Sequence, residues 1–261
     1  MLSKLFNEHI LKVTIMVKWY KRKKSDISIE DAMKSGPYIP PPSRENEVQT
    51  VDVPPDFEPL FAKAEETVAS FFDDMDWSPT KGTLMIGGSR YVLMSAESLQ
   101  DIPISLSRDL DIPIEKANKL FYKLAKSIGK DDARRFIYKM GVTEPIAKLS
   151  AGPVHFAFTG NARVAFLPSN PVPDENYLLR YDHPQSFEAD EYIRKNGPIS
   201  KSPVCLWNSG YSSGWCSESF SIEVDAREIS CRAMGHKHCR FVMAVESKLD
   251  DFIKETLKEG F

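Results

Sequence analysis

One stretch near the C-terminus decides the fold: Glu228-Ile229-Ser230-Cys231-Arg232-Ala233-Met234-Gly235-His236-Lys237-His238-Cys239-Arg240-Phe241. Just before it, apolar and polar residues alternate over residues 221–229, which predicts a strand with one buried face. Ile222, Val224 and Ala226 share that face, and by the same parity so does Glu228. A carboxylate on a buried face is costly unless it has a partner.

Cys231 and Cys239 offer that partner. Gly235 lies between them and suits a tight turn, so a hairpin would bring both cysteines together beside Glu228. Tetrahedral zinc accepts thiolate sulfur and carboxylate oxygen. The spacing therefore indicates a metal site.

Other interpretations of these residues stay open at this point. Buried cysteines also behave as small hydrophobic side chains without any metal. His236 and His238 are rival ligands, although a turn tip is more often solvated. All four cysteines follow residue 200 in a chain without a secretory signal, which favours a reduced intracellular site over disulfides.

The composition excludes several classes of protein. Of the 261 residues, 42% are hydrophobic and 27% charged, as in an ordinary globular protein. The 34 basic and 37 acidic side chains give a net charge of -3, which argues against a nucleic-acid partner. No apolar run reaches about 18 residues, so we expect no transmembrane span and a cytoplasmic protein.

Residues 1–56 are predicted to be an N-terminal extension. Residues 1–24 combine apolar residues at helical spacing with a basic cluster, which fits a helix at a membrane surface, an organelle-targeting sequence or an unstructured extension. Residues 25–56 are proline-rich and predict a linker. We place the start of the domain near Asp56.

Residues 57–150 are predicted to form a hairpin and helices. The helices are expected at Phe57–Asp74, 96–109, 114–128 and 130–140, with Gly129 and Gly141 ending the last two. The hairpin joins two apolar runs at Gly87-Gly88.

Residues 151–261 are predicted to form most of the sheet. Strands are expected at 177–181, 221–229 and 240–245, with a second hairpin or bent strand over Val154–Leu167. Helices are expected at 186–195, 203–217 and 247–258. The whole predicts an α+β fold, with helices packed on an antiparallel sheet.

Three motifs in this half resemble the 4-vinyl reductase domain: Gly210-Tyr211-Ser212-Ser213-Gly214-Trp215, Glu228-x-x-Cys231 and Gly235-His236-Lys237-His238-Cys239-Arg240-Phe241. That domain occurs in hydrocarbon-binding proteins and in the sensor halves of phenol- and xylene-responsive activators of aromatic catabolism. Its fold is similar to that of TRAPP core subunits. Weaker similarity to the sensors extends upstream, over roughly residues 75 to 245.

The resemblance implies a closed structural zinc site. Its ligands would be Cys205, Glu228, Cys231 and Cys239, with Cys216 left over as a structural residue.

The resemblance also implies a ligand pocket. The phenol sensors hold phenol with a His and a Trp, which fall on His155 and His183 here. The imidazole in place of the indole is a departure, because it is smaller and can accept or donate a hydrogen bond. The alternative for His155 is an ordinary half-buried strand histidine. We expect four aromatic residues to line the pocket: Phe156, Phe158, Tyr211 and Trp215.

The sequence thus predicts a stand-alone module that binds a small aromatic, hydrocarbon or lipid-like molecule, as a homodimer. No P-loop motif is present, and four protein ligands leave zinc no open position, so we do not expect an enzyme. The alternative is a scaffold or tethering-like subunit with a filled pocket.

Overall fold

The computed structural model describes residues 48–260, and residues 1–24, with their predicted membrane contact, lie outside them. Within residues 48–260, no helix is both long and apolar enough to cross a bilayer. The strands are β1 (Val51–Asp52), β2 (Met75–Ser78), β3 (Thr83–Ile86), β4 (Ser89–Tyr91), β5 (Ala162–Phe166), β6 (Leu178–Ser186), β7 (Asp225–Ser230) and β8 (Cys239–Ala244). The α-helices are α3 (Glu58–Asp73), α4 (Ala96–Gln100), α5 (Ile102–Asp109), α6 (Ile114–Met140), α7 (Pro145–Phe158), α8 (Phe187–Asn196), α9 (Leu206–Phe220) and α10 (Glu246–Lys258).

The main sheet has the order β1-β5-β6-β8-β7. Its pairs are antiparallel except for β1 with β5, which run parallel. The strands β2, β3 and β4 form a separate antiparallel sheet. This confirms the predicted α+β class.

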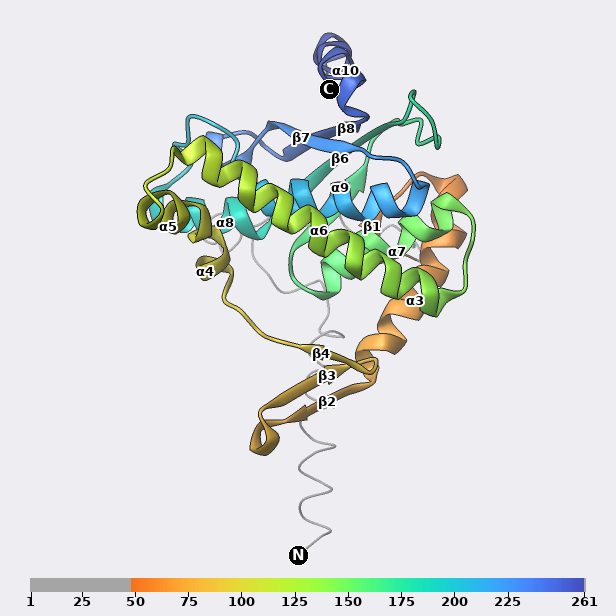
Figure 1. Cartoon of the computed structure of the whole chain (residues 1–261). Helices are drawn as coiled ribbons and strands as arrows, with labels where there is room; N and C mark the ends of the chain where they lie inside the picture. The colour runs from red at the N-terminus through yellow and green to blue at the C-terminus, as the bar shows by residue number, and fades with distance from the viewer. Residues whose placement is uncertain (1–47, 261) are drawn as a thin grey trace, which may run out of the picture. The chain divides into compact units, whose positions relative to one another are not determined.

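Helices cover the main sheet on both faces (Figure 1). Helix α10 packs on one face, where Leu249 joins Leu178, Val242 and Ala244 in a small apolar cluster. Helices α7 and α9 cover the other face, and α6 packs along α9. The main core lies under α7 and α9, between these helices and the inward side chains of β6, β7 and β8.

The contact between α6 and α9 depends on glycines. A Cβ at Gly129 would lie 2.2 Å from the Tyr211 carbonyl oxygen, and one at Gly214 would lie 2.0 Å from that of Lys126. These residues therefore let two helix backbones meet. The predicted helix end at Gly129 is wrong, because α6 continues through this glycine to Met140, where Gly141 ends it at φ 62°.

The prediction of strand structure over Val154–Leu167 is only partly right. Its second half forms β5, but its first half belongs to helix α7. This helix is buried on nearly every side, so its sequence has no polar face to show a helical period. Gly152 and Pro153 further disguise it, since both are poor helix formers.

The boundary near Asp56 is also too late. Val51–Asp52 pairs with β5, and Val48, Val51 and Val53 are buried in the main core. A segment this short and proline-rich gains its order from the sheet edge rather than from local propensity.

Candidate metal centre and adjoining pocket

Four buried residues from separate elements converge at one end of the main sheet. Cys205 is the N-cap of α9, Glu228 lies in β7, Cys231 follows β7 and Cys239 begins β8. One side-chain oxygen or sulfur from each lies within 4.8 Å of the other three. The 3₁₀ turn Arg232–Met234 and Gly235, at φ 88°, close the hairpin that brings the two C-terminal cysteines together.

The spacing of these atoms fits a tetrahedral ion. With metal–sulfur bonds of about 2.3 Å, two thiolates in a tetrahedron lie about 3.8 Å apart. The Cys205 and Cys239 sulfurs are 3.6 Å apart, and those of Cys231 and Cys239 are 3.9 Å apart. Oε2 of Glu228 accepts a hydrogen bond from the Cys205 backbone N–H, while Oε1 has no hydrogen-bond partner among the described residues. That oxygen is the fourth donor.

Burial makes this set costly without a cation. Desolvation raises the pKa of Glu228 well above its usual range, and the adjacent Cys231 thiol raises it further. Desolvation likewise raises the pKa of Cys205. Buried thiolates and a carboxylate need a positive partner to stay ionised, and a divalent ion supplies one. The four residues can therefore hold a metal ion.

The cluster shares one face of the sheet with an apolar region. His183 of β6 pairs in register with Cys239, Tyr181 with Phe241 and Leu179 with Met243. Side chains at alternate positions point to the same face, so the metal ligand and the aromatic residues line one surface. Helix α9, which begins at the cluster, covers that surface.

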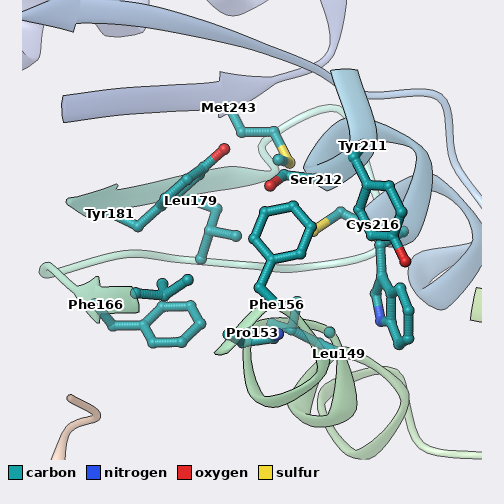
Figure 2. Close-up of a pocket in the computed structure, with 13 residues that line it drawn as sticks. Leu149, Pro153, Phe156, Phe166, Leu179, Tyr181, Tyr211, Ser212, Cys216 and Met243 are labelled. Carbon is teal, nitrogen blue, oxygen red and sulfur yellow. The ribbon is translucent and has the colours of Figure 1, made fainter. Parts of the chain in front are cut away.

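A small cavity of about 30 Å³ lies in this apolar region. Phe156 rises from α7 into the middle of its lining, with Tyr181 and Met243 on the sheet and Tyr211 on α9 around it (Figure 2). The remaining lining residues are Leu149, Gly152, Pro153, Val164, Phe166, Leu179, Ser212, Trp215 and Cys216. The volume holds roughly one or two water molecules.

His155 lies just behind the cavity wall. Its ring stacks on those of Trp215 and Tyr211, with centroids 5.7 and 6.4 Å away. The Tyr211 hydroxyl donates to Asp132 and lies 3.2 Å from His155 Nδ1. Nδ1–H therefore donates to Tyr211, which leaves Nε2 as an acceptor without a partner among the described residues. Desolvation lowers the pKa of His155 to about 4, so the ring is neutral at neutral pH.

His183 lies on the other side of Phe156. Its centroid is 6.1 Å from that of Phe156 and 4.5 Å from that of Phe241. Desolvation lowers its pKa to about 3, and neither ring nitrogen has a partner among the described residues. A buried imidazole left in this state is destabilising by about 1–3 kcal/mol per unsatisfied group.

Glu188 is a further buried carboxylate that the sequence did not single out. Its two oxygens accept hydrogen bonds from the backbone N–H groups of Trp207 and Asn208, in the first turn of α9. Desolvation raises its pKa to about 8, although these N–H donors oppose the rise. Glu188 thus anchors the helix whose N-cap is Cys205.

The structure brings some predicted ligand residues together and separates one. Phe156, Tyr211 and Trp215 line the cavity, while His155 and His183 contact these rings from outside it. Phe158 lies elsewhere and stacks on Phe72 at 5.2 Å. His155 is fully buried in α7, not half-buried in a strand. The rival ligand His236 is exposed and lies outside the four-residue cluster.

Sequence comparison identifies two matched regions. Residues 187–245 match the 4-vinyl reductase domain. Residues 71–168 match the family described as activator of aromatic catabolism. These matches confirm the resemblance inferred from the motifs. No curated protein matches the sequence.

Two solved structures are similar. The first is the phenol-responsive sensory domain of the transcription activator PoxR with phenol, at 23% identity and a TM-score of 0.62, covering 75% of this chain and 94% of that chain. The second is a trafficking protein particle complex subunit 3 from Naegleria fowleri covalently bound to palmitic acid. It matches at 14% identity and a TM-score of 0.41, covering 58% of this chain and 95% of that chain. The first match establishes the same fold.

Proposed function

We propose that this chain, with its 4-vinyl reductase and aromatic-activator regions, is a sensor module for a small apolar molecule that bears a hydroxyl group. One observation carries the proposal: two buried imidazoles flank an aromatic cavity with unpartnered ring nitrogens. A hydroxyl can donate to Nε2 of His155 and accept from His183. The similarity to a phenol-responsive sensory domain supports this choice of ligand.

The metal in this proposal is one structural zinc ion held by Cys205, Glu228, Cys231 and Cys239. Three thiolates and one carboxylate would fill its tetrahedral coordination. When bound, zinc would neutralise the buried thiolates and link the start of α9 to β7 and β8. No open position would remain for substrate, so the proposed role is non-enzymatic.

One observation favours a second candidate, a scaffold or interaction subunit with a filled pocket. The cavity of about 30 Å³ is far below the roughly 300–1,000 Å³ typical of ligand sites. Phe156 occupies the space between Tyr211 and His183. Ligand binding therefore requires these side chains to move, whereas a scaffold would leave them in place.

Three further parts of the proposal are predictions that the described residues do not test. They are a homodimer, a cytoplasmic location with membrane association or organelle targeting through residues 1–24, and a division at residue 150 between the hairpin-and-helix part and the zinc-binding part.

The test is phenol binding by the natural protein and by a His183→Leu variant. Phenol should raise the Tm of the natural protein in a concentration-dependent way, because a ligand specific for the folded state stabilises it. The variant should lose this response while its unliganded stability is unchanged or higher, since an unsatisfied polar group is removed. Unchanged zinc content would show that the metal site is intact. A natural protein that ignores phenol and other small hydroxylated aromatics at high concentration would favour the scaffold.

A further inference from the structure

A second, larger groove lies beside the core cavity. Its volume is about 590 Å³, within the range of sites for small molecules. The walls come from the β1 edge and following turn, α3, α7, β6 and the loop after β5. The residues are Asp52, Val53, Pro54, Pro55, Phe57, Phe61, Ile146, Leu149, Phe166, Leu167, Pro168, Ser169, Pro171 and Leu179.

The groove and the cavity have a common wall. Leu149, Phe166 and Leu179 line both of them. Each comes from a different element, so they form a partition of side chains with no backbone strand across it. Figure 2 shows Phe166 and Leu179 on the side of the cavity away from Tyr211. Rotation of these side chains would join the two spaces.

The chemistry of the groove suits an apolar chain. Four of its lining residues are prolines, which have no backbone N–H to donate. Its one charged lining residue, Asp52, is paired with Arg163. The hydrogen-bonding groups of the region lie instead beyond the partition, at His155 and His183.

We propose that the ligand has two parts, a hydroxylated ring for the core cavity and a linear apolar tail for the groove, which is also its entrance. This inference rests on the proposed function and extends it to the class of ligand. The tail would pass between Leu149, Phe166 and Leu179. Because the groove already has ligand size and the cavity does not, the tail supplies apolar burial that helps open the cavity.

The experiment compares phenol with 4-butylphenol by isothermal titration of the full chain. Each fully buried methylene strengthens binding by about fourfold, so a partly buried butyl chain should lower the Kd by at least about tenfold. The groove variants Ile146→Glu and Phe57→Glu should bind phenol as the natural protein does but lose most of the gain from the tail. Two variants are used because Ile146 also packs on the core. Ile199→Glu is the matched control, since Ile199 is exposed and lies outside the groove.

The outcomes separate this inference from the function beneath it. If phenol binds but the butyl chain adds nothing, or if both groove variants keep the full gain, the groove is not the tail site and the sensor proposal stands. If the Ile199→Glu control loses the gain as well, the tail binds elsewhere and the inference is wrong. If neither phenol nor 4-butylphenol binds, the proposed function fails and the inference fails with it.

Discussion

The metal cluster and the aromatic cavity lie on the same face of one sheet, but the fold prepares them differently. In the cluster, the donor atoms of Cys205, Glu228, Cys231 and Cys239 already lie within 4.8 Å of one another. In the cavity, Phe156 fills the centre and both imidazoles keep unpartnered nitrogens. The first site is complete in geometry and needs only an ion. The second must change shape to hold its ligand.

The comparison teaches where each site contributes free energy. A preformed set of donors adds the free energy of metal binding directly to the free energy of unfolding. A cavity with unsatisfied polar groups lowers the stability of the unliganded protein, and a ligand restores it. Substitutions in the two regions should therefore differ in size and in response to ligand.

The largest effect is expected from Cys239→Ala. Loss of this ligand should reduce the free energy of unfolding by several kcal/mol, on the order of 5, because structural zinc contributes folding free energy outright. Denaturant unfolding measures the change. Cys216→Ala is the matched control, a buried cysteine outside the cluster, and should cost about 1–2 kcal/mol. Equal losses in both variants would contradict the distinction.

A somewhat smaller loss is expected from Phe156→Ala. Removal of this ring should reduce the free energy of unfolding by about 3–5 kcal/mol. Phenol should then raise the Tm of the variant more than that of the natural protein, because space opens between Tyr211 and His183. Phe220→Ala, at a buried aromatic residue packed on Tyr177, should lose similar stability without rescue. Equal rescue of both variants would show that phenol merely fills any void.

A third prediction concerns acid stability. The pKa of His155 is about 4 in the folded protein and 6.5 in an unfolded chain, so the unfolded state takes up the proton first as pH falls. Asp132 raises this pKa, Arg135 lowers it, and Tyr211 contacts the ring. The stability due to the neutral ring is complete above pH 6.5 and is lost as pH falls toward 4.

Between pH 7 and pH 5, the natural protein should therefore lose about 2 kcal/mol more free energy of unfolding than His155→Gln. Denaturant unfolding at the two pH values measures this difference. If the two proteins lose stability in parallel, the imidazole is not buried and neutral as described.

The smallest effect is expected from His236→Ala. This residue is exposed on the turn between Cys231 and Cys239 and lies outside the cluster. The change in the free energy of unfolding should be within about 0.5 kcal/mol. Metal content should be unchanged. A variant that loses its metal would make His236 a ligand and would overturn the four-residue assignment.

The same contrast explains how far the sequence could predict the molecule. Strand parity placed Glu228 on the buried face, and the motifs supplied Cys205, because these features are local. The cavity depends on α7, whose uniformly apolar sequence hides its helical period. Leu149 and Pro153 were therefore missed as lining residues. Gly129 was misjudged for a related reason, since the approach of Tyr211 to this glycine is a tertiary contact that no local pattern reveals.

The central claim is that the cluster holds one zinc ion that supports the whole sheet face. Metal analysis of the purified full chain, alongside Cys239→Ala and Cys216→Ala, tests it most directly. We predict one zinc per chain in the natural protein and in Cys216→Ala, and clearly less in Cys239→Ala. A natural protein that is folded, free of zinc and reactive at all four thiols under native conditions would contradict the claim.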